Sequence, residues 1–318
     1  MVVIGRNEGE RLVNCLNSIR ASASRVIYVD SGSTDASVES ATKFKVYVVR
    51  LDPNLPFTAA RARNEGFLAL KVLHPDIRFV QFIDGDCTLV SGWLEAARAF
   101  LTDRRDVAIV CGRRRERHPD GSLYNRLCDL EWDTPVGEAA ACGGDALVRS
   151  EAFEAAGRFR STLIAGEEPE LCLRLRLQGW RIWRLDTGMT LHDAAITRFG
   201  QWWARAVRCG YGYADVAWLH RNSPNGIWRR ETLRALMWGG LLPAAIGIGA
   251  LGRPAVLLGA LLYPLQIGRL ALKDRSGSRF AWQRAALVTV GKFAEFQGIL
   301  RLLWYKARRR AATLIEYK

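Results

Sequence analysis

The chain has 318 residues, of which 49% are hydrophobic and 25% charged, a composition typical of a globular protein rather than a disordered one. Its net charge of +14 and its eleven tryptophans favour acidic partners such as nucleotides, nucleic acid or anionic lipid. The seven cysteines are dispersed, odd in number and without a Cys-x-x-Cys pair. They argue against a disulfide framework or a zinc site and favour reduced core thiols of a cytosolic domain.

Short apolar strands alternate with helices over the first eighty residues. Strands are predicted at 2–4, 25–30, 45–50 and 79–84, with helices at about 8–20 and 59–73, and Ser33 can cap a further helix. Met1 leads directly into the first strand, so we expect no signal peptide, although that strand looks clipped. The alternation predicts an α/β fold with a mostly parallel, Rossmann-like sheet flanked by helices.

Two of the predicted strands end in carboxylates. Asp30 closes the second strand, and Asp84 closes the run 79–84 and is followed by Gly85 and Asp86. In open α/β sheets ligands bind beyond the carboxyl ends of the strands. Paired acids there are costly without a positive partner, which a divalent cation would supply, and Gly85 would let a phosphate-bearing ligand come close. Taken alone, this motif is equally a solvated Asp-Gly turn.

Six short motifs resemble family 2 glycosyltransferases in order and spacing, and the resemblance continues to His192, over about two thirds of the chain. It implies a GT-A fold that binds a nucleoside-diphosphate sugar and transfers the sugar with inversion. The motifs are Ile4-Gly5-Arg6-Asn7-Glu8, Val29-Asp30-Ser31-Gly32-Ser33-Thr34-Asp35, Ala60-Arg61-Ala62-Arg63-Asn64, Asp84-Gly85-Asp86, Gly143-Gly144-Asp145-Ala146 and Gly166-Glu167-Glu168-Pro169-Glu170-Leu171.

The resemblance assigns nine residues to the donor. Residues 6–8 match the turn that meets the nucleoside. Asp30 and Asp84 match acids that contact the base or ribose, and the arginines at 61 and 63 suit phosphate geometry. Without the resemblance, the first turn is equally a helix entry and the arginines a solvated helix face. The donor-binding set is Arg6, Asn7, Glu8, Asp30, Ser33, Arg61, Arg63, Asn64 and Asp84.

A divalent cation, manganese or magnesium, is implied by the same resemblance. In the Asp-x-Asp motif Asp86 would ligate the metal, and Asp84, also a candidate ligand, would contact the ribose. His192 stands where related enzymes often supply a third ligand or a diphosphate contact. The metal would neutralise the leaving diphosphate as the bond to the sugar breaks. The alternative for a lone histidine is a structural role.

The candidate catalytic residues are Glu168, the proposed base, and Glu167 before it. An inverting transfer needs a carboxylate that faces the acceptor hydroxyl. Glu168 stands where the family usually has aspartate, so its side chain is one methylene longer. Pro169 suits the first turn of the helix that follows, because its missing N–H is not needed there. Without the resemblance, both glutamates are ordinary charges at a helix start.

The acceptor side is expected at two places. Gly144 and Asp145 resemble the acceptor loop, in which glycine lets backbone approach a ligand and the acid holds a hydroxyl. Trp202 and Trp203 offer an aromatic platform for a sugar or an acceptor loop. The stretch Gln201–Arg205 does not match the Gln-x-x-Arg-Trp of processive synthases, which argues against a polymerising enzyme.

The last hundred residues differ in composition. Residues 235–252 and 254–268 are uncharged and close to the span of about twenty that a membrane requires. Basic residues precede and follow the pair, so both ends of a hairpin at 235–268 would lie in the cytoplasm. Two buried core helices are the alternative. Residues 281–310 suit an interfacial helix on anionic lipid. The basic residues are Arg229, Arg230, Arg234, Arg269, Lys273, Arg275 and Arg308–Arg310.

We therefore expect a catalytic domain at 1–222 and a membrane-associated helical region at 223–318, with catalysis on the cytoplasmic face of the cytoplasmic membrane. The predicted function is the metal-dependent transfer of one sugar, UDP-linked by preference, to a lipid-linked or membrane-borne acceptor in glycan or exopolysaccharide biosynthesis. A polyprenyl-phosphate sugar synthase and a non-catalytic nucleotide-sugar-binding scaffold are the alternatives. Nucleic acid is not expected, because the tryptophans lie among apolar residues.

Overall fold

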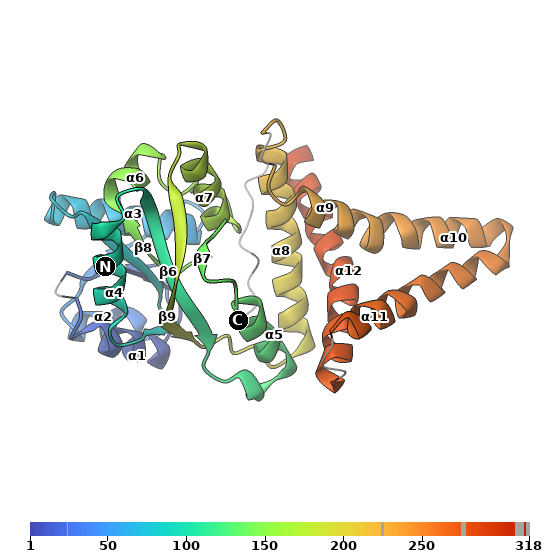
Figure 1. The fold of residues 1–318 in the computed structure, drawn as a ribbon, viewed down its shortest axis with the longest axis horizontal. Helices are drawn as coiled ribbons and strands as arrows, with labels where there is room; N and C mark the ends of the chain where they lie inside the picture. Colours follow the sequence, from blue (N-terminus) through green and yellow to red (C-terminus); the bar gives the residue numbers. More distant parts are fainter. Residues whose placement is uncertain (24, 224–225, 275–277, 309–314, 316–318) are drawn as a thin grey trace. The chain divides into compact units, whose positions relative to one another are not determined.

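The computed structural model describes residues 1–23, 25–223, 226–274, 278–308 and 315 (Figure 1). The chain divides into two compact units, Met1–Thr197 and Arg198–Lys318. The sequence places the boundary after 222, but helix α8 (Phe199–Leu219) packs against α12 (Arg279–Ala307) and belongs with the second unit. Arg275, Arg309 and Arg310 of the predicted basic flanks lie outside the described residues.

The first unit is built on one mixed sheet in the order β3-β2-β1-β4-β8-β6-β9-β5, with β7 paired to β9. Strands β3, β2, β1 and β4 are mutually parallel, as are β6 and β9, and the remaining pairs are antiparallel. The strands are β1 (Val2–Gly5), β2 (Ile27–Asp30), β3 (Tyr47–Arg50), β4 (Phe79–Asp84), β5 (Cys87–Leu89), β6 (Val107–Glu116), β7 (Gly137–Glu138), β8 (Ala146–Arg149) and β9 (Arg181–His192).

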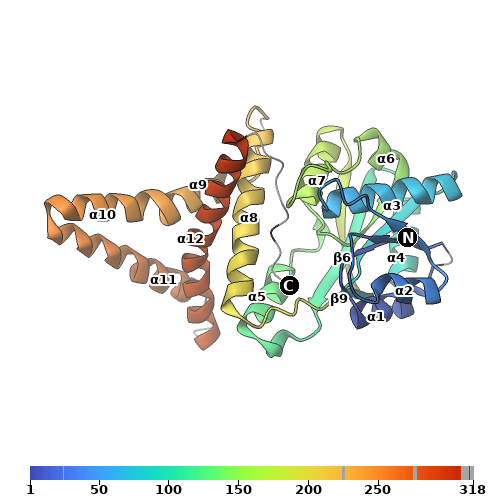
Figure 2. The same cartoon turned by 180° about the vertical axis from the view of Figure 1, so that it is seen from behind.

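Helices cover both faces of this sheet (Figures 1 and 2). Alternation along β4 points Phe82 toward α6 and Gln81 toward α4, because Phe82 contacts Phe153 while Gln81 accepts a hydrogen bond from Trp93 Nε1. The predicted α/β fold is thus confirmed. The helices of this unit are α1 (Glu10–Ile19), α2 (Ser37–Lys43), α3 (Ala59–Leu73), α4 (Trp93–Asp103), α5 (Leu123–Glu131), α6 (Ser150–Ala155) and α7 (Glu167–Leu177).

The strand ends that carry acids meet at one edge, as predicted. Asp30 stands opposite Gly5 in the pairing of β2 with β1, and Asp84 stands opposite Ile4 in the pairing of β4 with β1. Because all three strands run in the same direction, their last residues share one edge of the sheet. The loops that follow β1, β2 and β4 therefore surround a common space.

Two local predictions were wrong. Ser33 does not cap α2, which begins at Ser37; the Ser33 hydroxyl instead accepts a hydrogen bond from the Asn7 amide. Gly85 does not leave room for a phosphate. A Cβ there would lie 3.1 Å from the Ile4 carbonyl oxygen and 3.2 Å from Glu8 Cγ, so the glycine is needed by the protein's own close contacts.

The second unit is helical. Helix α9 (Arg229–Leu236) continues through a π-helical segment, Met237–Leu241, into α10 (Leu242–Gly252). Pro243 explains the π-helical segment, because its ring displaces the preceding turn and it offers no N–H. Arg253 has an extended conformation before Pro254 and ends α10, as expected of a residue that precedes proline. A 3-10 segment, Pro254–Leu261, then leads into α11 (Leu262–Lys273).

The two arms of this hairpin are long and apolar enough to cross a membrane. The spans Arg229–Gly252 and Pro254–Lys273 have only 11% and 6% of their most apolar windows buried. Leu251 and Leu258 are 89% and 67% exposed. The alternative of two buried core helices does not describe them. Exposed apolar surface of this extent marks an interaction with a membrane or a partner.

Helix α12 has a packing partner, which the sequence reading as an interfacial helix did not include. Glycines allow α8 and α12 to approach closely: a Cβ on Gly210 would lie 2.1 Å from the Glu295 carbonyl oxygen, and one on Gly298 would lie 2.1 Å from the Val207 carbonyl oxygen. Such small-residue contacts are typical of close helix pairs. One face of α12 is therefore buried against α8, with Ala281, Ala285, Ala294 and Leu302 also buried.

Candidate active site

The acid at the end of β4 is held by a buried arginine. Arg63, on α3, donates to Asp84 Oδ1 at 2.8 Å and to Glu167 Oε1 at 2.7 Å. Its side chain is only 3% exposed. Burial raises the pKa of Asp84, but the positive charges of Arg63 and Arg114 lower it by a larger amount. The net pKa of Asp84 therefore lies below its usual value. Arg63 thus joins the end of β4 to the first turn of α7.

Asp145 and Arg114 also hold Asp84 in place. Asp145 is fully buried; its Oδ1 accepts from the Asp84 amide at 3.0 Å and its Oδ2 from Thr190 Oγ1 at 2.8 Å. Arg114, from β6, donates to Asp84 Oδ2 at 3.2 Å and lies 3.6 Å from Asp145 Oδ2. This places Asp145 behind the strand end, where it orients Asp84, rather than at a surface open to an acceptor.

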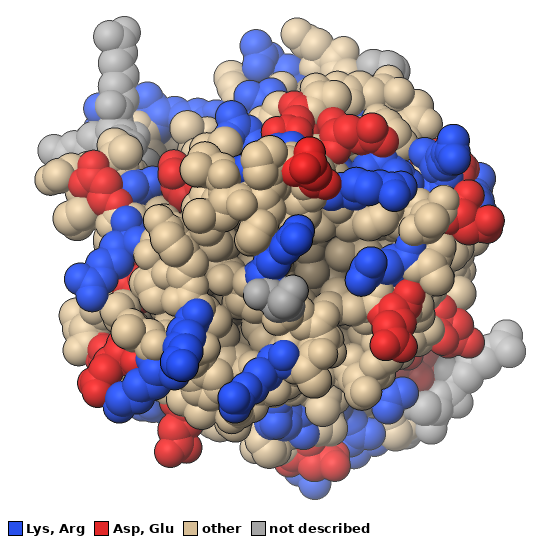
Figure 3. Space-filling model, turned by 90° about the vertical axis from the view of Figure 1, so that its left-hand side faces the viewer, with Lys and Arg blue, Asp and Glu red and all other residues tan. Residues whose placement is uncertain are grey.

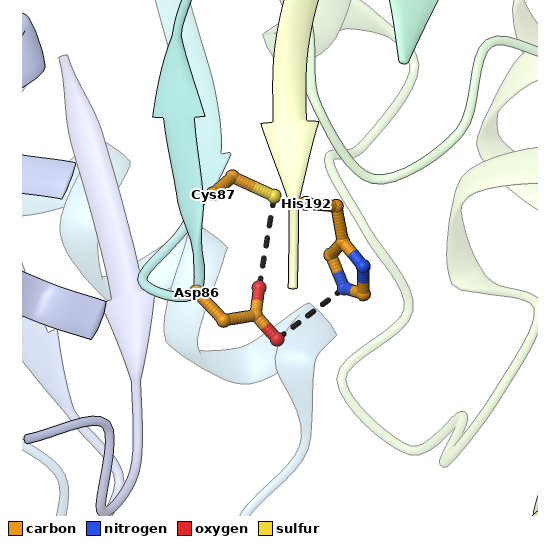
Figure 4. A group of neighbouring side chains, drawn as sticks. All are labelled: Asp86, Cys87 and His192. Carbon is orange, nitrogen blue, oxygen red and sulfur yellow. Dashed lines mark hydrogen bonds and ion pairs between the residues drawn. The ribbon is translucent and has the colours of Figure 1, made fainter. Parts of the chain in front are cut away.

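Asp86, Cys87 and His192 form the cluster in Figure 4, where the Asp86 carboxylate lies between the other two side chains. His192 Nε2 is 3.3 Å from Asp86 Oδ2, and the Cys87 thiol is 3.6 Å from Asp86 Oδ1. The antiparallel pairing of β5 with β9 sets Cys87 opposite His192. Ligand atoms of all three lie within 4.8 Å of one another and could hold a metal ion. The predicted ligands Asp86 and His192 are thereby brought together.

Glu116 lies on the other side of the imidazole. Its Oε2 is 3.6 Å from His192 Nδ1, just beyond hydrogen-bonding distance, and accepts from the Ala194 amide at 3.0 Å. Its Oε1 accepts from the His118 amide at 3.1 Å. Although burial raises the pKa of Glu116, its contact with His192 and these amides lower it to a net value below the usual one. A carboxylate so placed can orient a ligating histidine.

Glu168 has a different environment. Its Oε1 accepts from the Cys142 amide at 2.6 Å, from Cys142 Sγ at 3.0 Å and from Cys172 Sγ at 2.9 Å. Burial raises the pKa of Glu168, and these hydrogen bonds offset only part of that effect. Among the described residues, no lysine or arginine nitrogen lies within ion-pair distance of it. A buried carboxylate with a raised pKa is suited to general-base chemistry.

The turn after β2 is organised by Asp30. Its Oδ2 accepts from the amides of Gly32 and Ser33 at 3.1 and 3.0 Å. The turn after β1 is tied to it, because Asn7 Oδ1 accepts from the Thr34 amide at 2.7 Å. Asn7 has a positive φ of 54°, a conformation asparagine tolerates better than most residues. These predicted donor residues therefore lie together in two linked turns.

Four other predicted donor residues have contacts within the protein. Arg6 lies over the Phe57 ring at 5.6 Å, and Glu8 pairs with Arg11 at 2.9 Å. The remaining two are buried on α3. Arg61 Nη1 donates to the main-chain oxygens of residues 52, 55 and 56, and Asn64 binds the amide and carbonyl of Phe159. The last two therefore hold neighbouring loops in place.

Gly144 and the tryptophan pair have contrasting positions. A Cβ on Gly144 would lie 2.7 Å from Arg63 Nη2 and 3.2 Å from Asp84 Oδ2, so glycine is required for the loop to reach the acidic edge. Trp202 and Trp203 lie on α8 in the second unit and pack against Phe199. Trp203 Nε1 donates to Gln297 on α12. Their acceptor role stays a prediction.

Several residues around the candidate active site were not assigned a role from the sequence. Trp132 packs edge-on against His192, with ring centroids 4.8 Å apart, and lies under the Arg114 guanidinium at 4.9 Å. Three further residues were also not singled out from the sequence. Glu116 lies at the end of β6, Cys142 in the loop between β7 and β8, and Cys172 in the second turn of α7, so only the fold brings them to the site.

Comparison with known proteins finds similarity to glycosyltransferases. Residues 1–154 match the family model described as glycosyl transferase family 2. The chain is 30% identical over 287 residues to a pre-mycofactocin glycosyltransferase of Mycobacterium tuberculosis, and the same match is found in two strains. The matched region covers 85% of this chain and 57% of that protein, so the chain spans little more than half the length of these curated relatives.

Solved structures share the fold. The mannosyltransferase PcManGT from Pyrobaculum calidifontis, solved with GDP-Man and Mn²⁺, superposes with a TM-score of 0.66 at 17% identity, covering 96% of this chain and 87% of that one. TarS of S. aureus, residues 1–349, gives a TM-score of 0.52 at 13% identity, covering 97% and 91%. At these identities the similarity establishes the GT-A-like fold alone.

Proposed function

We propose that the chain is a family 2 glycosyltransferase, the family whose model residues 1–154 match, and that it transfers one sugar from a nucleoside-diphosphate sugar to a membrane-borne acceptor. The observation that carries the proposal is the bridge formed by Arg63. It brings the Asp84 strand end, with Asp86 two residues on, to the first turn of α7, where Glu168 lies. A donor-binding acid edge and a candidate base are thus assembled at one site.

The donor nucleoside would lie in the linked turns that follow β1 and β2. There, Asp30 fixes the amides of Gly32 and Ser33, and Arg6 and Glu8 flank the same space. Asp84 would face the ribose. We assign Arg63, Arg61 and Asn64 to support of this space rather than to direct nucleotide contact, because all three are buried and bonded within the protein. Arg114 is partly exposed and lies 3.2 Å from Asp84 Oδ2, and it is the cation that we assign to offset diphosphate charge.

A divalent cation would be held by Asp86 and His192. A carboxylate and an imidazole form a donor set that suits manganese, and Glu116 is placed to orient the imidazole. When bound, the cation supplies positive charge to the leaving diphosphate. The Cys87 thiol is a poor third ligand for a hard cation, because sulfur is a soft ligand.

Glu168 would accept the proton of the acceptor hydroxyl. Its raised pKa increases its basicity, and the hydrogen bonds from Cys142 and Cys172 fix the carboxylate in place. Glu167 is committed to Arg63, so it serves to position the loop rather than to take the proton. The acceptor would be lipid-linked, since the exposed apolar hairpin α10–α11 offers a membrane anchor.

The membrane proposal also accounts for the basic composition. On the face shown in Figure 3, lysine and arginine side chains are spread among acidic and uncharged ones and do not form a continuous basic patch. This face therefore lacks the gathered cations that nucleic-acid binding uses. Attraction to anionic lipid by basic residues beside the hairpin, such as Arg229 and Arg230, is the use we propose for the excess charge.

A thermal-shift panel of nucleotide sugars, with and without Mn²⁺, tests the donor assignment on the full chain in detergent. The correct donor should raise the melting temperature only with Mn²⁺, because ligand binding stabilises the folded state by mass action. The same shift should be lost in Asp86→Asn and retained in Asp120→Asn, a matched control on the short 3-10 turn Pro119–Gly121. Absence of a shift for every nucleotide sugar would contradict the proposal.

A further inference from the structure

Two thiols contact the carboxylate that we propose as the base. Cys172 lies four residues after Glu168 on α7, so the helix itself places both side chains on one face. Cys142 comes from the segment between β7 and β8, and its amide and thiol both bond to Glu168 Oε1. Three ligand atoms from two separate stretches of chain, one of them a helix, therefore converge at the base.

The spacing of these atoms is close to one face of a tetrahedral metal site. The two sulfur atoms are 3.9 Å apart, and each lies 2.9–3.0 Å from Glu168 Oε1. With zinc–sulfur bonds of about 2.3 Å and a zinc–oxygen bond of about 2.1 Å, tetrahedral angles require separations of about 3.8 Å between sulfurs and about 3.6 Å between sulfur and oxygen. The sulfur pair already fits. Each sulfur–oxygen distance needs to lengthen by about 0.6–0.7 Å, which a small rotation of the side chains supplies.

The chemistry of the set selects a soft cation. Two thiolates and one carboxylate suit zinc, cadmium or cobalt, whereas magnesium prefers oxygen ligands and manganese accepts carboxylate with imidazole, as at Asp86 and His192. The charge of the set is also unbalanced. The neighbours of Glu168 on α7 are paired, Glu167 with Arg63 and Glu170 with Arg174, but Glu168 has no such cation among the described residues.

We propose that Cys142, Cys172 and Glu168 form an inhibitory binding site for a soft divalent cation of the zinc type. The ion replaces the two thiol protons, which leave to water, and it occupies the Glu168 oxygen that the reaction needs. Transfer therefore stops, although the Asp86–His192 pair keeps its own cation. This inference rests on the proposed function, because only a catalytic Glu168 makes the site inhibitory.

Binding is tested first by titrating the metal-free, full-length protein with Co²⁺ and recording the thiolate-to-cobalt charge-transfer absorption in the near ultraviolet. One equivalent should produce the band, and Zn²⁺ should abolish it. The band should be at least halved in Cys142→Ser and in Cys172→Ser and absent from the double variant. It should persist in Cys87→Ser, the matched control at the other thiol-containing cluster. Serine keeps a hydrogen-bond donor to Glu168, which limits damage to the fold.

A second readout uses the wild-type chain alone. Zn²⁺ should slow alkylation of the half-buried Cys142 thiol at least tenfold, as measured by peptide mass spectrometry. The transfer assay is run with saturating Mn²⁺, and each protein's rate is normalised to its own rate without zinc. Compared with wild type, the Zn²⁺ concentration that halves the rate should be at least tenfold higher in the double variant and unchanged in Cys87→Ser.

The two assays separate the site from the activity. A cobalt band that disappears only in Cys87→Ser, or no band in wild type, would overturn the site whether or not transfer has been detected. A normal band with zinc-insensitive transfer would overturn the inhibitory role. Since the spectrum needs no donor or acceptor, an error in the proposed function would not alter the binding result.

Discussion

Replacing Arg63 with methionine tests whether electrostatics hold the site together. The substitution keeps most of the side-chain volume but leaves Glu167 without its cation, and Asp84 with Arg114 alone. Removing one partner of a buried ion pair costs about 3–5 kcal/mol. We expect about 3 kcal/mol, the lower end, because the Asp84 side chain is 26% exposed and keeps one arginine.

The dependence on pH identifies the cause. The pKa of Asp84 lies below its ordinary value of 3.8, because the two arginines outweigh the effect of burial. Its contribution to stability is therefore present above pH 3.8 and is lost as the pH falls through the folded value. In Arg63→Met, Asp84 loses one of the two cations that offset its burial, so protonation of Asp84 relieves part of the cost. The difference in free energy of unfolding should shrink as the pH falls from 7 toward 4.

Urea unfolding of the full chain in detergent, followed by pulse proteolysis of the first unit, measures this difference. Arg61→Met is the matched control, because Arg61 is also buried on α3 but its Nη1 bonds only to main-chain oxygens. Its cost should not vary with pH. A loss below about 1 kcal/mol for Arg63→Met, or one that is constant between pH 7 and 4, would refute the reasoning.

Three further predictions follow from the same contacts. Gly210→Ala should destabilise the α8–α12 pair by about 1–3 kcal/mol, because its Cβ would meet the Glu295 carbonyl oxygen; Gly200→Ala on the same helix, where nothing lies within 4 Å, should be neutral in thermal unfolding of the second unit. Glu168→Gln should raise the free energy of unfolding at pH 7 but not at pH 4. Because the folded pKa of Glu168 is raised, its carboxyl group contributes stability below the ordinary pKa of 4.5, and this contribution is lost as the pH rises through the folded pKa. An equal effect at both pH values would contradict the burial argument. Replacing both Leu251 and Leu258 with aspartate should move the protein from the membrane to the soluble fraction with nucleotide affinity retained, whereas Leu73→Asp, at an exposed site on α3, should leave it in the membrane fraction.

Much of the first unit could be predicted from the sequence because its signals are local. The run Phe79–Asp84 and the helix Ala59–Leu73 were predicted with their observed bounds, since an apolar strand and a periodic helix are each specified by neighbouring residues. The shared edge of Asp30 and Asp84 followed from strand direction alone. The two apolar arms of the hairpin were likewise visible as uncharged stretches.

The rest depends on contacts between distant residues. Arg63 and Glu167 are 104 positions apart, and Cys142 and Glu168 are 26 apart, so no local pattern reports either contact. The burial of Arg61, Asn64 and Asp145 is equally invisible in sequence, where arginine and aspartate read as exposed. The contact of helix α12 with α8 was not predicted for a similar reason, because the glycines that fit the two helices together give no amphipathic signal.

Turnover of Glu168→Gln tests the central claim most directly. The substitution keeps the side chain's shape and a hydrogen-bond acceptor but cannot take a proton at neutral pH. We predict at least about a hundredfold loss in the rate of sugar transfer to membrane lipid, with donor affinity unchanged, since removal of a general base costs about 10²–10⁴. Glu167→Gln should retain much more activity. Normal transfer by Glu168→Gln together with an inactive Glu167→Gln would contradict the assignment.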